Sequence, residues 1–173
     1  APLENGAIGS VDAPFEGIIA LDGNLTTELL TEIAASPLFA KADLRVAPAS
    51  PGKAERLKAL YRHPNVTLYV NLEEAGLICD TSFSNSAEAA AGLIAHGAGR
   101  VLVTDGPHSA SEATGLDVLT ATPPTVICAR VTGAGDTFMA AHITAEREGA
   151  ARVDALTFAL HAAAQFVSGE TPV

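Results

Sequence analysis

The residues with the clearest chemical meaning form the run Val131-Thr132-Gly133-Ala134-Gly135-Asp136-Thr137, which precedes an apolar stretch with helical spacing. Two glycines around a small residue let backbone N–H groups gather around an anion, and the positive end of the following helix points to the same place. Asp136 is poorly placed to bind phosphate, because like charges repel, but well placed to take a proton from an attacking hydroxyl. The structural alternative is a tight turn with Asp136 as a first-turn charge. Because an apolar stretch precedes the loop and a helix follows it, the run favours phosphoryl transfer.

A second group of polar residues, Asn71-Leu72-Glu73-Glu74, follows a predicted buried strand. In doubly wound sheets, ligands bind beyond the carboxyl ends of the strands, which is where these side chains fall. Asn71 and Glu74 are three residues apart on a first helical turn and therefore face the same way. They could hold Mg²⁺ beside a nucleotide, with Glu74 bound through the metal's waters. The alternative is an N-cap asparagine followed by acidic first-turn residues.

A third group, Thr104-Asp105-Gly106-Pro107, ends the next predicted strand. Gly106 permits close approach of the backbone, and the Thr104 hydroxyl suits a phosphate or a ribose. The alternative is an ordinary turn, because Asp-Gly-Pro is strong turn chemistry. Three loops at strand ends, each suited to a nucleotide, together favour a nucleotide site over three unrelated turns.

Alternating β-like and helical stretches must position these loops, and they predict a mainly parallel sheet covered by helices on both faces. Strands are expected at 17–21, 44–47, 66–70 and 101–104, with a further apolar strand at 126–129 before the glycine loop. Residues 111–122 predict a small hairpin with an exposed loop. Helices are expected at 26–35, 53–61, 86–96, 137–148 and 153–167. We find no repeat or linker, so a single domain over residues 1–173 is expected.

The composition narrows the classes of partner. The formal net charge is -10, and the chain has no Lys/Arg cluster, which argues against nucleic-acid binding. No apolar run approaches the length of a membrane span, and Ala1-to-Ser10 lacks the features of a signal peptide. We expect a cytoplasmic protein with no membrane partner. Cys79 and Cys128 are far apart in the sequence and are expected to be two buried thiols in a reducing compartment.

In this order, the three motifs resemble the C-terminal portion of the ribokinase-like (PfkB) family of carbohydrate and nucleoside kinases, and the likeness covers essentially the whole chain. Two further stretches, Leu21-Asp22-Gly23-Asn24-Leu25 and Ala47-Pro48-Ala49-Ser50-Pro51-Gly52-Lys53-Ala54, are most similar to the pseudouridine-kinase branch. The resemblance implies a ribokinase-like α/β fold, ATP and Mg²⁺, and a small sugar or nucleoside as the phosphate acceptor.

The resemblance also implies a role for each motif residue. Asp136 would be the catalytic base, and Gly133, Ala134 and Gly135 the anion hole. Asn71 and Glu74 would serve the Mg²⁺–phosphate region, with Glu74 reaching the metal through water. Thr104 and Gly106 would contact the nucleotide, and the small-residue face at Ala159, Ala162 and Ala163 would lie beside adenine.

Two departures from the family pattern limit what the resemblance implies. The family's N-terminal part, with its substrate-binding glycine pair and β lid, has no counterpart here, so a homodimer or a separate N-terminal part is the expected partner. Arg130 replaces the acidic residue at the start of the glycine signature, which argues against the family's monovalent-cation site. Three hypotheses follow: an ATP-dependent sugar or nucleoside kinase, a nucleotide-binding remnant without catalysis, and an interaction domain that keeps the motif as a fold element.

Overall fold

The fold is built on one six-stranded sheet. It was obtained as a computed structural model that describes residues 8–115 and 117–169; the predictions made for residues 1–7 and for the last residues of the chain fall outside this range. The strands lie in sequence order, with β1 to β4 parallel and β5 and β6 antiparallel. Their bounds are β1 Ile18–Asp22, β2 Asp43–Ala47, β3 Val66–Asn71, β4 Arg100–Thr104, β5 Ala110–Thr114 and β6 Asp117–Ala121.

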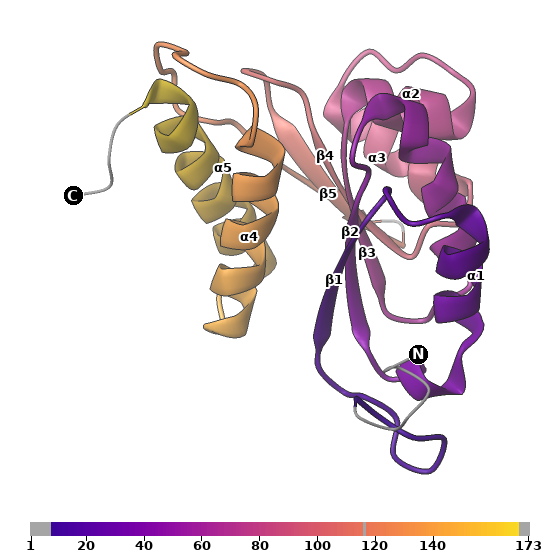
Figure 1. Cartoon of the computed structure of the whole chain (residues 1–173). Helices are drawn as coiled ribbons and strands as arrows, with labels where there is room; N and C mark the ends of the chain where they lie inside the picture. Colours follow the sequence, from indigo (N-terminus) through magenta and orange to yellow (C-terminus); the bar gives the residue numbers. More distant parts are fainter. Residues whose placement is uncertain (1–7, 116, 170–173) are drawn as a thin grey trace.

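One face of the sheet is covered by the segments that connect the parallel strands (Figure 1). These segments are α1 Thr27–Ala35, the short η1 Pro37–Phe39, the 3₁₀-helix η2 Pro51–Leu60, α2 Leu72–Cys79 and α3 Ser86–Ala95. Alternate residues of the strands, such as Leu44, Leu68 and Val101, point into the larger core on this side. Burial of these aliphatic side chains holds the connecting helices against the parallel strands.

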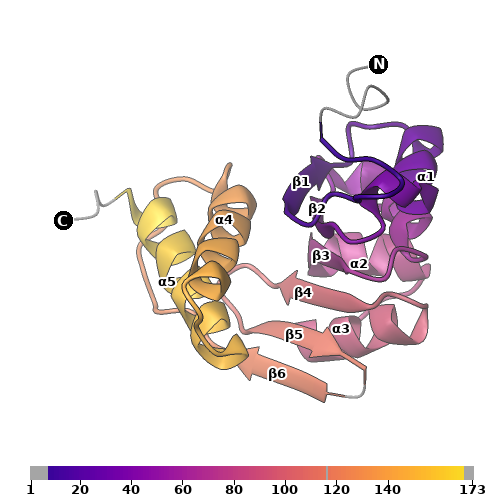
Figure 2. The same ribbon diagram turned by 90° about the horizontal axis from the view of Figure 1, so that it is seen from below.

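The opposite face is covered by α4 Ala134–Arg147 and α5 Arg152–Ser168, which pack closely against each other. Their core is smaller and contains Tyr69 and Leu102 from the sheet with Phe138 and Leu156 from the helices. α5 lies over β5 and β6 and α4 over β3, and the two helices leave β1 uncovered on this face (Figure 2). Ala20, in the middle of β1, is accordingly exposed.

The predicted α/β architecture is confirmed: the sheet is mainly parallel, and helices cover both of its faces. Two element predictions were wrong. Residues 126–129 form no strand but an irregular loop, because β6 already ends the sheet on that side and Ile127 is 90% exposed. Of the α-helix predicted at 53–61, residues 53–60 lie in a 3₁₀-helix and Tyr61 is its C-cap; the segment begins at Pro51 without a side-chain hydrogen bond from its N-cap residue Ser50.

One further expectation, about a side chain, needs correction. Cys79 is buried as predicted, but Cys128 is exposed because it lies on the irregular loop. The small hairpin expected at 111–122 is confirmed: β5 and β6 pair antiparallel and Gly115 at their turn is exposed, while β5 itself is almost fully buried between α3 and the second helical layer. None of the helices within residues 8–115 and 117–169 is long and apolar enough to cross a membrane.

Candidate active site

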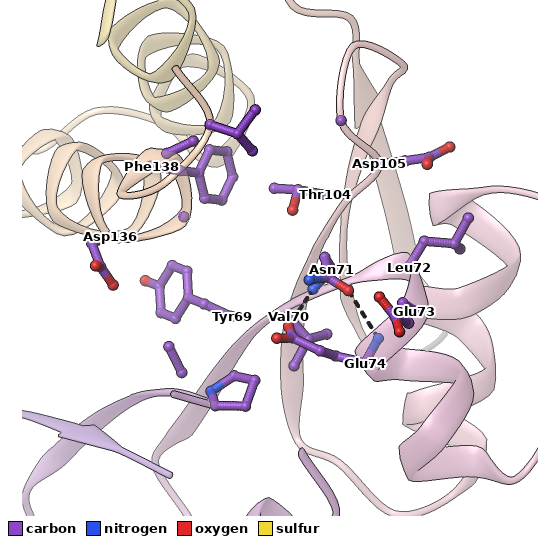
Figure 3. Close-up of a pocket in the computed structure, with 16 residues that line it drawn as sticks. Tyr69, Val70, Asn71, Leu72, Glu73, Glu74, Thr104, Asp105, Asp136 and Phe138 are labelled. Carbon is purple, nitrogen blue, oxygen red and sulfur yellow. Dashed lines mark hydrogen bonds between the residues drawn. The ribbon is translucent and has the colours of Figure 1, made fainter. Parts of the chain in front are cut away.

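The three predicted loops meet at one cavity. The carboxyl ends of parallel strands β3 and β4 lie at the same edge of the sheet, and the N-terminus of α4 faces them across a cavity of about 500 Å³ (Figure 3). Of the predicted site residues, seven line it: Asn71, Glu74, Thr104, Gly106, Ala134, Gly135 and Asp136. Gly133 is not among the lining residues. Three segments, the outermost of which are at least sixty residues apart in the sequence, are therefore brought to one concave site.

Asn71 and Glu74 bind each other at the start of α2. The Asn71 side-chain oxygen accepts the Glu74 N–H at 2.9 Å, and Glu74 Oε2 accepts the Asn71 N–H at 2.9 Å, which is a complete capping box. The N-cap interpretation is therefore correct for both residues. Burial raises the pKa of the Glu74 carboxyl, the backbone hydrogen bond from Asn71 opposes that rise, and the neighbouring Glu73 adds to it. Glu74 retains its second carboxylate oxygen for a ligand in the cavity.

The glycine loop begins α4 with a backbone that a side chain would not tolerate. Gly133 is the N-cap residue with φ of 94°, and a Cβ there would lie 2.9 Å from the Phe166 ring. The Ala134 N–H donates to the Val131 carbonyl at 3.0 Å, so this amide is used in the turn itself. The next amides, of Gly135 and Asp136, belong to the first helical turn, where N–H groups have no intrahelical acceptor.

A second cavity, of about 320 Å³, continues from the first behind the glycine loop. Thr104, Gly106 and Gly135 line both cavities. The second is bounded by the irregular loop after β6, including Val126, and by the C-terminal half of α5, including Ala163. Gly106 has φ of 54°, a left-handed conformation that favours glycine. The loop therefore carries no side chain at the point where the two cavities join. Of the three alanines predicted to lie beside adenine, Ala163 lines the second cavity, and Ala159 and Ala162 do not.

Two lining residues were not singled out from the sequence. Tyr69 lies two residues before Asn71 on β3, and Phe138 lies two residues after Asp136 on α4. Their rings meet edge to face, with centroids 6.5 Å apart. The period of two along a strand places Tyr69 on the same face as Asn71, so the alternation could have identified it. Figure 3 shows Tyr69 between Asp136 and the Asn71–Glu74 pair on the floor of the cavity.

Arg130, which replaces the acidic residue of the signature, turns away from the anion loop toward the end of α5. Its guanidinium lies 3.9 Å from the centre of the Phe166 ring, and its Nε donates to the Phe166 carbonyl at 2.8 Å. Its positive charge thus lies at the C-terminal end of α5, where free carbonyl groups attract cations. Among the described residues, no cluster of three or more His, Cys, Asp or Glu side chains could ligate a metal directly.

Solved structures similar to this one include a carbohydrate kinase, a phosphofructokinase and an adenosine kinase. A carbohydrate kinase from Agrobacterium tumefaciens is 26% identical with a TM-score of 0.69, and the match covers 89% of this chain and 48% of that chain. Phosphofructokinase-2 from Escherichia coli in complex with potassium is 20% identical with a TM-score of 0.76, covering 96% and 54%. Adenosine kinase from Sinorhizobium meliloti is 17% identical with a TM-score of 0.74, covering 90% and 51%.

The chain therefore spans about half the length of these solved relatives. A search of curated proteins gave no significant match. The sequence profile described as pfkB family carbohydrate kinase matches residues 7–171, which is nearly the whole chain. With this match and the shared fold, the chain belongs to the pfkB family of carbohydrate kinases.

Proposed function

We propose that this chain is the nucleotide-binding half of an ATP-dependent kinase that phosphorylates a hydroxyl group of a sugar or nucleoside. The observation that carries the proposal is the cavity itself, which places the Asp136 carboxylate beside the first-turn amides of α4 and opposite the Asn71–Glu74 and Thr104–Gly106 loops. A carboxylate beside amides suited to an anion fits the transfer of a phosphoryl group to a neutral hydroxyl.

In the proposed reaction, Asp136 accepts the proton of the acceptor hydroxyl as its oxygen attacks the γ-phosphorus. The bond between the γ-phosphorus and the bridging oxygen then breaks, and ADP leaves with the electron pair. The Gly135 amide and the positive end of α4 stabilise the charge on the transferred group, as Gly133 and Ala134 do indirectly by shaping the loop. Thr104 and Gly106 contact the nucleotide where the two cavities join.

Magnesium fits this site as a companion of the nucleotide phosphates. The one remaining carboxylate oxygen of Glu74 can accept a hydrogen bond from a metal-bound water, in keeping with how Mg²⁺ is usually held. Bound Mg²⁺ would neutralise negative charge on the phosphates. Asn71 contributes by fixing the Glu74 carboxylate through the capping box. The contacts of Arg130 with Phe166 do not favour a monovalent-cation site at the start of the glycine signature.

The identity of the sugar or nucleoside that accepts the phosphoryl group is a separate question from the reaction class. The relatives described above include a carbohydrate kinase, a phosphofructokinase and an adenosine kinase, and none of them favours the pseudouridine-kinase branch. A pseudouridine-like or ribose-like acceptor stays a prediction from the sequence. The partner would be either a second copy of this chain or the family's N-terminal part.

A second candidate function is nucleotide binding without catalysis. It rests on the same two joined cavities, because an anion loop beside a second cavity suits a bound nucleotide whether or not transfer follows. A thermal-shift titration with ADP and Mg²⁺ separates either nucleotide function from a purely structural domain, since a ligand that binds only the native state raises the unfolding temperature.

The Asp136→Asn variant tests the catalytic proposal. Loss of a general base typically lowers a rate by about 10²- to 10⁴-fold, so transfer to sugars and nucleosides should fall to background while ADP binding persists. Asp154→Asn is the matched control, because Asp154 is also a first-turn aspartate, on α5. Equal turnover in wild type and Asp136→Asn would contradict the assignment. Nucleotide binding with no transfer in the wild type would favour the second candidate.

A further inference from the structure

Beneath α4 lies a largely buried polar network that the proposed reaction does not use. It joins the five neighbouring strands β2 to β6 to the two helices of the second layer, and most of its members are charged. The three cations are Arg45 on β2, Arg100 on β4 and Arg152 on α5. The four carboxylates are Asp43, Glu112, Asp117 and Glu146, and the uncharged members are Tyr69 and His142.

His142 occupies the centre of this network and is fully buried. It is on α4, six residues after Asp136, which is about 9 Å along the helix axis. Its Nδ1 lies 2.9 Å from the Tyr69 hydroxyl and 3.6 Å from Glu146 Oε2. Its Nε2 lies 3.8 Å from Glu112 Oε2, and within residues 8–115 and 117–169 neither of these two atoms has a hydrogen-bond partner.

The donors and acceptors fix the direction of the hydrogen bonds. Arg45 Nη1 donates to the Tyr69 hydroxyl at 3.0 Å, because a guanidinium can only donate. The buried tyrosine must therefore give its own proton to another group, and His142 Nδ1 is the acceptor within reach. His142 then carries its proton on Nε2, facing the Glu112 carboxylate. The opposite tautomer would aim a lone pair at that carboxylate and leave the tyrosine proton unused.

Tyr69 is where this network reaches the candidate active site. It is one of the residues that line the larger cavity, and its hydroxyl forms hydrogen bonds with Arg45 and His142 of the network. The ring also contacts Phe138 and His142 edge to face, with centroid distances of 6.5 and 5.6 Å. Both partners lie on α4, the helix that begins with the anion loop and carries Asp136. One side chain of the sheet thus touches the cavity and supports this helix.

We propose that Tyr69 and His142 form a positioning pair: the Tyr69 hydroxyl donates to Nδ1 of a neutral, Nε2-protonated His142, and this bond sets the position of α4 relative to the sheet. The position of α4 in turn determines where the Asp136 carboxylate and the Gly135 amide lie over the cavity. The catalytic consequence rests on the proposed function, whereas the tautomer and the position of the helix do not.

The tautomer is tested by nuclear magnetic resonance on the full chain labelled with ¹⁵N-histidine at neutral pH. Two-bond proton–nitrogen correlations distinguish a protonated Nε2 from a protonated Nδ1. We expect His142 to show a protonated Nε2 and an unprotonated Nδ1. A proton on Nδ1, or on both nitrogens, overturns the proposal, and this measurement needs no variant.

The positioning role is tested with Tyr69→Phe, which removes one oxygen and keeps the ring. We expect the backbone amide signals of Gly135 and Asp136 to shift and the His142 tautomer signals to change. Tyr61→Phe is the matched control, because Tyr61 also has a buried hydroxyl but that oxygen has no hydrogen-bond partner among the described residues. It should leave the Gly135, Asp136 and His142 signals in place.

A second pair of variants covers the case in which Tyr69→Phe does not fold. His142→Asn offers a carboxamide oxygen that can accept the Tyr69 proton, whereas His142→Leu offers no acceptor. The Gly135 and Asp136 amides should stay closer to their wild-type positions in His142→Asn than in His142→Leu. Unchanged amide signals in Tyr69→Phe, or equal shifts in the two His142 variants, overturn the positioning role. Failure of the proposed function is separate, because it would appear as absent nucleotide binding or absent transfer.

Discussion

Asn71 and Glu74 show how one pair of side chains can serve both the fold and a ligand. Each uses one side-chain oxygen to accept the other's backbone N–H. The N-terminus of α2 is therefore capped without any ligand. The carboxylate that would serve Mg²⁺ is consequently held at a defined place on the cavity wall. At this position the structural and the functional interpretations of the motif are compatible.

Replacement of Asn71 by alanine should therefore destabilise the chain. Loss of an N-cap side chain costs about 1 kcal/mol of the free energy of unfolding, and here it also frees the Glu74 side chain. Asn71→Asp is the control, because its carboxylate can still accept the Glu74 N–H. Urea denaturation should give a lower free energy of unfolding for Asn71→Ala than for Asn71→Asp. Equal values for the two variants would show that the cap contributes nothing.

Glu112 is the most deeply buried carboxylate in the network under α4, with no exposed surface. Burial acts to raise the pKa of Glu112, but His142 and the guanidinium groups of Arg152 and Arg100 lower it to about 2 from the ordinary value of 4.5. The ionised form is thus favoured by folding. This difference corresponds to a contribution of about 3 kcal/mol to stability, present above pH 4.5.

Acid should remove that contribution. A carboxyl group with a lowered pKa in the folded state loses its stabilising effect as the pH falls from about 4.5 to about 2. Glu112→Gln should therefore be less stable than the wild type at pH 7, and its stability should fall less steeply over that acid range. Glu32→Gln, at an exposed position of α1, is the control. Parallel pH curves for wild type and Glu112→Gln would contradict the expectation.

At the scale of elements, α4 carries both the candidate chemistry and the contacts that hold it. Its first turn faces the cavity, and its next turns bury Phe138, Met139 and His142 against the sheet and α5. The loop before it is held from the other side, because the Phe166 ring of α5 lies against Gly133. The anion loop is therefore fixed between two elements rather than being a free turn.

The two loop glycines should respond differently to alanine. Gly133→Ala places a Cβ 2.9 Å from Phe166 Cζ at a residue with φ of 94°, so it should destabilise the chain by about 1–3 kcal/mol and weaken binding of ADP. Gly135→Ala meets nothing within 4 Å and lies in the first turn of a helix, so its stability should equal or exceed that of the wild type. Thermal unfolding of both variants is the measurement. Equal loss of stability in the two would show that Phe166 does not constrain the loop.

For the whole molecule, the sequence alone predicted the parallel sheet, the helices on both faces and the three loops that meet at its edge. These features follow from local patterns: strand periodicity, helix starts and glycine signatures. The strand expected at 126–129 was wrong because an apolar run cannot show whether a neighbouring strand is available to pair with it. Long-range pairing also hid the role of Glu112, whose partners Arg100 and Arg152 lie 12 and 40 residues away in the sequence.

Strand alternation places Tyr69 on the face of Asn71, but the hydrogen bonds of its hydroxyl were out of reach of motif reasoning. Its hydroxyl partners come from segments 24 and 73 residues away, so only the assembled fold brings them together. The same holds for the join between the two cavities, which depends on the path of the irregular loop after β6. Short motifs identified the polar residues that line the cavity. The tertiary structure revealed that Tyr69 and Phe138 also line it and that His142 holds Tyr69 from below.

The uncovered strand β1 has a practical consequence for handling the isolated chain. Within the described residues, β1 pairs only with β2, so one edge of an Ile-Ile-Ala-Leu strand is left with unpaired backbone groups. Such an edge is a template for another strand. Concentrated solutions of the chain should therefore self-associate, with sedimentation coefficients that rise with concentration.

The Ala20→Lys variant should keep the protein dispersed, because it adds a charge to an exposed residue of that strand without touching the core. Its thermal midpoint should match that of the wild type while its sedimentation becomes independent of concentration. Glu32→Lys, which adds the same charge on α1, should sediment like the wild type. Identical self-association of Ala20→Lys and wild type would show that the chain self-associates through a surface other than β1. If the expectation holds, binding titrations on this chain are best made in the Ala20→Lys background, in which aggregation and ligand binding do not compete.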